Sequence, residues 1–219
     1  MVSTRSAGLT GMIGAAVFAV VVVLLTLAQL GFMMELGWKP LGASDVPWPS
    51  GLALGPLGWL QMLNFAFFGI TLIFFEIGLY RGVASSGRLS WAGPVLLVVA
   101  GVALVLVAFK TAPHVMQGPQ TWHGAIHLMA FLLLVLSFLL ALFFWWRRLS
   151  VDPRWRGYAP LHPDHGDPLY SAPLRVLLFA STWQWGFYLL GNVLIWIELM
   201  ALQLCRTAQT PPADSRRVR

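Results

Sequence analysis

The stretch from Thr121 to Arg148 limits most strongly what this chain can fold into. It opens with polar residues, carries His123 and His127, runs apolar through Phe144, and ends with two tryptophans and two arginines. A helix that spans a bilayer needs about 20 mostly apolar residues, and aromatic and basic residues are typical of its ends. The stretch therefore predicts a complete transmembrane helix.

The composition of the whole chain supports a membrane protein. Hydrophobic residues make up 58% of it and charged residues 10%, whereas about 25% of the residues in a soluble domain are charged. The net charge of +6 could indicate nucleic-acid binding, but the 14 Lys and Arg residues flank apolar runs, as in proteins whose helices they orient in a membrane. We expect the lipid bilayer and other membrane proteins as partners, and no nucleic acid. The single Cys205 excludes an intrachain disulfide and a cysteine-based zinc site.

Further apolar stretches have the length of a span. The first exceeds the apolar core of a signal peptide, about 7–15 residues, so we expect an uncleaved helix. The stretch from Trp91 to Phe109 is the most uniformly apolar, so we expect it to face lipid. The predicted fold class is an all-α, polytopic transmembrane helical bundle with five to six spans, forming one domain over residues 1–205. Residues 206–219 form a Pro-rich basic tail predicted to be disordered. These further spans are Leu9–Leu30, Leu57–Tyr80, Trp91–Phe109 and Leu174–Cys205.

The distribution of basic residues predicts an orientation. If successive loops alternate sides, only Lys39 and Lys110 fall in the loops of one side. Cytoplasmic loops are the ones enriched in Lys and Arg. The count therefore predicts a multi-pass protein of the cell membrane with a cytoplasmic N-terminus, and with the loop Gly31–Gly55 outside. The basic residues assigned to the cytoplasmic side are Arg5, Arg81, Arg88, Arg147, Arg148, Arg154, Arg156 and Arg175.

The final stretch leaves two topologies open. It makes about 48 Å of helix, enough for one crossing and too little for two. One crossing gives five helices and places Arg206 and the basic tail outside, against the charge rule. Six crossings require the polar segment His162–Tyr170 to enter the bilayer, where its His, Asp and Pro residues are unfavourable. We expect five crossings, and expect the HPDHGD sequence within this segment to lie in a solvated loop.

Several stretches together resemble the Domain of Unknown Function 998 family, prokaryotic integral membrane proteins. The resemblance implies about six helices and no known reaction. The chain departs from the family pattern at Ala112, where an acidic residue is usual, and at His162–Tyr170, which replaces a fifth helix. The stretches that carry the resemblance are GPLGWLQMLNFAFFG (Gly55–Gly69), FKTAP (Phe109–Pro113), TWHGAIH (Thr121–His127), DPRWRG (Asp152–Gly157) and LLGNVLIWIELMALQL (Leu189–Leu204).

Two histidines form the first candidate site. His123 and His127 are four residues apart and share one helix face. Small and polar residues continue that face, which is typical of close helix packing in a bilayer. The pair could bind a metal or a haem iron, although a zinc site needs a third protein ligand. Alternatively, both histidines hydrogen-bond to neighbouring helices or loops. The residues that continue the face are Ala130, Leu134, Ser137 and Ala141.

Carboxylates form the second group of candidates. Glu198 recurs with Gln184, Gly191 and Cys205 at heptad spacing, and we expect this face to point into the bundle, since a buried carboxylate costs several kcal/mol without a partner. With five crossings, Glu198 lies about 10 Å and His127 about 9 Å below the outer surface. The two side chains are then predicted to meet. We expect Glu76, near the cytoplasmic end of its helix, to pair with an arginine.

No complete catalytic constellation is present in the sequence. It contains no phosphate-binding glycine loop, nucleophile elbow or HExxH. The preferred interpretation is a non-catalytic structural, assembly or regulatory membrane component. The alternative is a membrane-embedded enzyme or redox/proton carrier that acts on a lipid or quinone near the outer leaflet through His123 and His127. The tryptophans that we expect at the two membrane interfaces are Trp59, Trp91, Trp122, Trp145 and Trp146.

Overall fold

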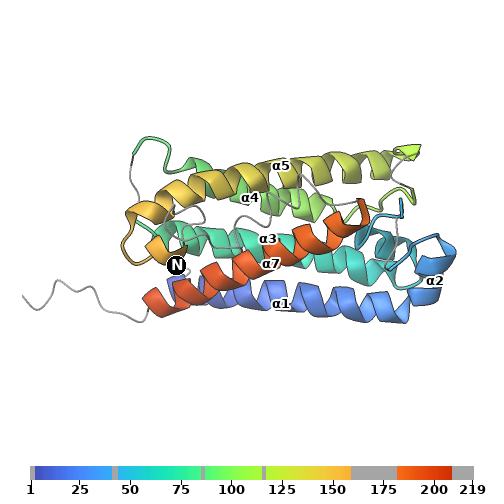
Figure 1. Cartoon of the computed structure of the whole chain (residues 1–219), viewed down its shortest axis with the longest axis horizontal. Coiled ribbons are helices and arrows are strands. Elements are labelled where there is room, and N and C mark those ends of the chain that lie inside the picture. The colour runs from blue at the N-terminus through green and yellow to red at the C-terminus, as the bar shows by residue number, and fades with distance from the viewer. Residues whose placement is uncertain (1–2, 41–43, 85–86, 115–116, 159–181, 209–219) are drawn as a thin grey trace, which may run out of the picture.

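The computed structural model describes residues 3–40, 44–84, 87–114, 117–158 and 182–208, and its regular elements there are all helical. The longer helices lie side by side in an elongated bundle (Figure 1). The all-α fold class is therefore confirmed, whereas the basic tail and the segment His162–Tyr170 lie outside these ranges. The elements are α1 (Thr4–Ala28), α2 (Leu30–Glu35), η1 (Ser50–Leu54), α3 (Gly58–Gly82), α4 (Ala92–Leu106), α5 (Trp122–Val151), η3 (Arg156–Tyr158) and α7 (Thr182–Thr207).

Among the residues that the structure describes, three helices are long and apolar enough to cross a membrane: α1, α3 and α5. The apolar helix α4 has 15 residues and α7 has 26. Capping side chains mark the starts of α1 and α5. Ser3 Oγ accepts a hydrogen bond from the Ser6 N–H (3.0 Å) at the start of α1, and Thr121 Oγ1 accepts one from the Gly124 N–H (3.2 Å) at the start of α5. The chain is an apolar helical membrane protein.

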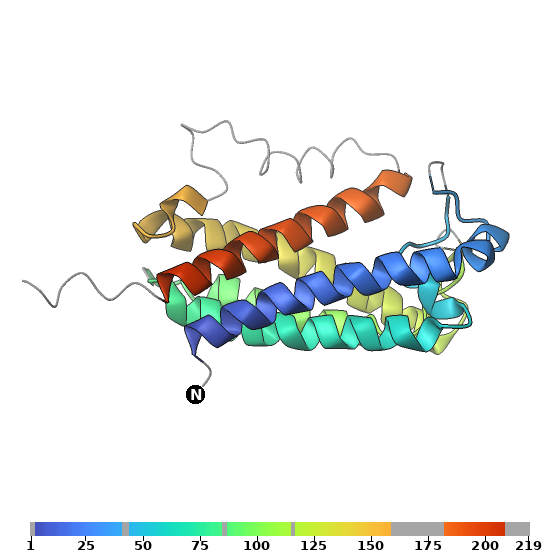
Figure 2. The ribbon, with the colours of Figure 1, turned by 90° about the horizontal axis from the view of Figure 1, so that it is seen from below.

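The direction of α7 decides between the two topologies. Cys205 Sγ lies 3.7 Å from the Arg5 carbonyl, and Gln203 Nε2 donates to the Arg154 carbonyl (2.8 Å). The red end of α7 lies beside the blue start of α1, as both ribbon views show (Figures 1 and 2). Thus α7 ends where α1 begins and runs antiparallel to it. The expectation of five crossings is wrong, because a fifth crossing would have carried α7 in the direction of α1.

This arrangement gathers basic residues at one end of the bundle, called the basic end here. The opposite end carries Lys39 and Lys110, after α2 and after α4. With α7 ending at the basic end, Arg206 joins the other arginines instead of opposing the charge rule. The basic end contains Arg5, Arg81, Arg88, Arg147, Arg148, Arg154, Arg156 and Arg206.

Small residues form the contact between α1 and α3. A Cβ at Gly14 would overlap Thr71, and one at Gly78 would overlap the Cβ of Ala7. Asn64 Nδ2 donates to a backbone carbonyl of α1 at 3.2 Å. The face of α3 that carries Asn64, Thr71 and Gly78 thus packs against α1, and its small residues allow the two backbones to approach closely.

The helix α4 lies between α3 and α5, and Val95 and Val102, which are 48% and 46% exposed, leave one side of it for the lipid that it was expected to face. A Cβ at Gly101 would lie 3.0 Å from the Gly69 carbonyl oxygen of α3, and one at Gly93 would lie 3.2 Å from Trp145 of α5. Glycines on two faces let α4 approach both neighbours. Its uniform apolarity therefore reflects both burial between helices and an exposed apolar side.

Candidate functional site

The two predicted histidines lie at the opposite end and hold the connection between α4 and α5. His123 Nδ1 lies 3.0 Å from Thr121 Oγ1 and 3.2 Å from the Lys110 carbonyl. His127 is 6% exposed, and its Nδ1 lies 2.7 Å from the Phe109 carbonyl. The alternative in which both histidines bond to a neighbouring loop is confirmed.

A metal site at this pair would need further ligands. Within the described ranges, no group of three or more His, Cys, Asp and Glu residues is placed to hold a metal ion. Zinc sites use at least three protein ligands, so His123 and His127 have no third one in that part of the chain. Metal or haem binding by the pair stays a prediction. The nearby His114 Nδ1 lies instead 3.2 Å from Asp45 Oδ1 and joins two surface loops.

A buried arginine organises the basic end. Arg148 on α5 is 4% exposed, and its guanidinium carbon lies 4.6 Å from the centre of the Tyr80 ring. Its N–H groups donate to carbonyls that α3 leaves free at its C-terminal end and in the loop before α4. A planar fork with several donors suits this task better than an ammonium group. The accepting carbonyls are those of Tyr80 (2.7 Å), Val83 (2.7 Å), Ala84 (3.3 Å) and Ser90 (3.1 Å).

The DPRWRG sequence forms a second clamp on the same loop. Asp152 is 2% exposed and accepts hydrogen bonds from the Ala84 N–H (2.9 Å) and from Arg154 Nη2 (2.8 Å), while Arg154 Nη2 also reaches the Gly82 carbonyl (3.1 Å). Burial raises the pKa of Asp152, but the hydrogen bonds from Arg154 and Ala84 outweigh it and lower that pKa to about 2. Asp152 is therefore an anion at physiological pH. The Asp152 carboxylate in turn raises the pKa of Arg154.

Glu76 is sealed inside the bundle, and the prediction that it pairs with an arginine is wrong. It is 1% exposed on α3, and no ion pair to it is present in the described part of the chain. Arg148 lies close enough to act on it electrostatically, but directs its N–H groups to the loop carbonyls. Both carboxyl oxygens of Glu76 are buried, and the indole N–H of Trp145 on α5 lies beside them. The feature of the sequence that indicated this burial was a single carboxylate within an otherwise apolar helix.

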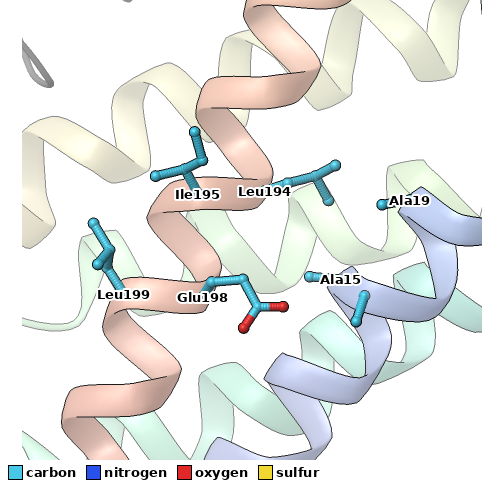
Figure 3. Close-up of a pocket in the computed structure, with 7 residues that line it drawn as sticks. Ala15, Ala19, Leu194, Ile195, Glu198 and Leu199 are labelled. Atoms are coloured by element: carbon cyan, nitrogen blue, oxygen red, sulfur yellow. The ribbon is translucent and has the colours of Figure 1, made fainter.

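Glu198 lies in a groove of about 230 Å³ between α1 and α7. Its carboxyl group points toward α1, where Ala15 and Ala19 face it (Figure 3). Glu198 is only partly buried, so its heptad face lies at the edge of the contact between α1 and α7 and not at the centre of the bundle, where it was predicted. The face that α7 buries carries Trp196, Ile197, Met200, Ala201 and Leu204 instead.

The predicted meeting of Glu198 with His127 is also wrong. Phe138 of α5 contacts Trp196 of α7, with ring centres 5.7 Å apart, and this sets the relative level of the two helices. His127 precedes Phe138 on α5 by about 16 Å, toward the end of the bundle opposite the basic end. The reversed direction of α7 separates the two groups, as the six-crossing alternative requires.

The tryptophans predicted at the interfaces fall into two groups. Trp59, Trp91 and Trp122 are 58%, 54% and 69% exposed at the starts of α3, α4 and α5, positions that suit an interface. Trp145 is 1% exposed and packs inside the bundle, so its assignment to an interface is wrong. Trp146 is partly buried.

Comparison with known proteins gives a family and no activity. A family model described as "Protein of unknown function (DUF998)" matches residues 49–163. No curated protein and no solved structure matches the chain. The matched region contains Glu76, both histidines and the Asp152 clamp, whereas α1 and Glu198 lie outside it.

Proposed function

Because the chain belongs to the DUF998 family, whose function is unknown, we propose its role from the geometry: it is a non-catalytic membrane component that assembles with another membrane protein. The proposed contact is the groove between α1 and α7. The observation that carries this proposal is the partly exposed carboxyl group of Glu198 in an otherwise apolar groove.

The depth of Glu198 makes a partner necessary. Ala15, which faces it, lies near the middle of α1, one of the helices long enough to span a membrane. A carboxylate at the centre of a bilayer costs roughly 2.5–3.5 kcal/mol on insertion scales. No ion pair to Glu198 is present in the described ranges. A donor on an incoming helix would remove this cost.

The opposite wall of the groove suits a helix. Ala15, Ala16 and Ala19 line it from α1. Small residues at this spacing let a neighbouring backbone approach closely, and a side-chain hydrogen bond then adds to the packing. The partner is therefore a transmembrane helix that carries a hydrogen-bond donor at mid-depth. The alternative of an enzyme acting through His123 and His127 has less support, because the Nδ1 atoms of both histidines lie against loop carbonyls.

Photo-crosslinking in native membranes tests the assembly. A photoreactive residue at Ile195, which is 48% exposed beside Glu198, is expected to give one discrete adduct with another membrane protein. Leu133 on α5, which is 43% exposed, is the matched control position. Glu198→Leu should reduce the adduct about tenfold, since the lost hydrogen bond is worth about 1–2 kcal/mol, whereas Glu198→Gln should retain most of it.

Three outcomes would contradict the proposed assembly. One is equal labelling from Ile195 and Leu133. Another is an Ile195 adduct that Glu198→Leu leaves unchanged. Stoichiometric zinc or haem in the detergent-purified protein would contradict the non-catalytic role and support the histidine-based alternative.

We also propose that the basic end faces the cytoplasm of a cell membrane, following the distribution of Lys and Arg. In a Cys205→Ser background, a membrane-impermeant thiol reagent added to intact cells is expected to label Ser44→Cys and to leave Leu89→Cys unlabelled. Leu89 is 58% exposed at the basic end, so it is labelled once the cells are opened. Labelling of Leu89→Cys in intact cells would reverse the orientation.

A further inference from the structure

Three residues on the outer side of α7 have the spacing of a helix that pairs with another helix. Ile195, Glu198 and Leu202 follow one another at intervals of four and three residues, as in the seam of a two-helix contact. Ile195 is 48% exposed, Leu202 is 36% exposed, and Glu198 between them is partly buried. These three residues are called the α7 seam here. They do not belong to the face that α7 buries in its own bundle.

The α7 seam borders the groove between α1 and α7. Ile195 and Glu198 line this groove from α7, and the Glu198 carboxyl group points across it toward α1 (Figure 3). Ala16 and Ala19 line it from α1. A helix in the groove therefore contacts the seam on one side and two alanines on the other, which allow its backbone to approach closely.

The depth of Glu198 favours a second copy of the chain as the partner. Copies that the same distribution of basic residues orients in a membrane point the same way. A two-fold axis that relates two such copies is parallel to the membrane normal, so α7 of one copy meets α7 of the other in parallel. Each Glu198 then lies at the same depth as its counterpart. Symmetry thus supplies a polar group at the required level.

Two glutamic acid side chains can also satisfy each other chemically. A protonated carboxyl group has one donor and acceptor oxygens, and two adjacent carboxyl groups share at least one proton because they do not both ionise. No ion pair or hydrogen bond to Glu198 is present among the described residues. One polar residue within an apolar seam also fixes the register of a parallel pair.

We propose that the partner in the α1–α7 groove is a second copy of this chain. In this dimer, α7 of each copy lies in the groove of the other, and the two Glu198 side chains hydrogen-bond to each other across the two-fold axis. The inference rests on the proposed assembly through this groove and names its partner.

Disulfide crosslinking in membranes tests the geometry of the dimer. In a Cys205→Ser background, differently tagged copies with Leu202→Cys are expected to crosslink under mild oxidation, because counterpart residues of a parallel seam lie within disulfide reach. Leu133→Cys on α5, which is 43% exposed, is the matched control and should remain uncrosslinked. Equal crosslinking at the two positions, or none at either Leu202→Cys or Ile195→Cys, would overturn the proposal.

Variants of Glu198 test the contact between the two carboxyl groups. Förster transfer between donor-labelled and acceptor-labelled copies, reconstituted at increasing dilution in lipid, measures their association. Glu198→Leu should weaken it by at least about tenfold, the equivalent of one hydrogen bond within a membrane. Glu198→Gln should retain most of it, because each amide offers the other a donor and an acceptor. Equal association of Glu198→Leu and the unchanged chain would contradict the pairing of these side chains.

A charge change tests whether Glu198 meets its own counterpart. Glu198→Lys should lose association with itself, because two ammonium groups then face each other, and should associate with the unchanged chain, where lysine meets a carboxyl group. Glu198→Lys copies that associate with each other as well as the unchanged copies do would overturn the proposal. Glu198→Leu introduces no charge, so its result decides the question if the lysine prevents membrane insertion.

The photoreactive residue at Ile195 separates this inference from the proposed function. An adduct of two copies of the chain supports both. An adduct with a different membrane protein, without a two-copy adduct, would overturn the dimer and leave the assembly through the groove in place. Absence of any adduct would contradict both.

Discussion

Arg148→Ala is expected to lower the free energy of unfolding by about 3–5 kcal/mol, the usual cost of removing one partner from a buried charged network. The guanidinium satisfies four carbonyls of the α3–α4 connection, and their nearest replacement is water that must enter a buried site. Unfolding in mixed detergent and SDS, followed by circular dichroism, measures the loss.

Two neighbouring variants identify the cause of the Arg148 effect. Arg148→Lys keeps the charge, but its three donors on one nitrogen cannot span the four carbonyls, so it should recover less than half of the lost stability. Arg147→Ala removes an exposed cation one residue away and should change stability by less than about 0.5 kcal/mol. If Arg147→Ala and Arg148→Ala had equal effects, the loss of stability would come from the loss of positive charge at this end and not from the hydrogen bonds of Arg148 to the four carbonyls.

The helices and some of their contacts could be predicted from the sequence. Hydropathy and interfacial residues indicated α1, α3 and α5. A spanning segment must satisfy its backbone hydrogen bonds internally, as a helix does, and must present apolar side chains to lipid. Asn64, Thr71 and Gly78 likewise recur every seven residues, and this spacing places them on the one face of α3 that meets α1. These features depend on residues within one helix.

The direction of α7 could not be read from its own residues. An apolar helix has the same hydropathy in either direction, so the choice rested on the polar segment before it and on the basic residues after it. These two signals conflicted. The contacts of Cys205 and Gln203 support the basic residues: Arg206 lies at the same end as Arg5.

The two intramembrane glutamates differ from expectation in opposite ways: Glu76 is more buried than predicted, and Glu198 is less buried. Glu76 was expected to pair with an arginine because Arg81 is close in sequence, and Glu198 was expected inside the bundle because its neighbours recur at heptad spacing. The burial of Glu76 depends on α4 and α5, and the partial exposure of Glu198 depends on the position of α1. Sequence spacing identifies which residues share a face, whereas the neighbouring helices decide what that face meets.

The motifs that carried the family resemblance also needed the structure for their roles. The sequence showed that these motifs are distinctive of the family. It could not show what their side chains bind, because the partners are backbone atoms, which have no sequence signature. His127 holds the Phe109 carbonyl at one end, and Asp152 holds the Ala84 N–H at the other. Each motif therefore fixes a connection to α4, and together they position this helix between α3 and α5.

The packing of α1 on α3 gives the second large expected effect. Gly78→Ala should lower the free energy of unfolding by about 2–3 kcal/mol, because its new methyl group overlaps the Cβ of Ala7 and forces the two helices apart. The overlapping atom is fixed to the α1 backbone, so a rotamer change cannot relieve it. The same detergent-based unfolding experiment measures this loss.

Exchanging the two residues tests that explanation. Ala7→Gly combined with Gly78→Ala moves the methyl group from one helix to the other and should recover most of the lost stability, whereas additive losses are expected for sites that do not touch. Gly191→Ala on α7 is the control, because a Cβ there meets no atom of the described residues within 4 Å and alanine is the better helix former. A double variant less stable than Gly78→Ala alone would show that the α1–α3 contact does not have this geometry.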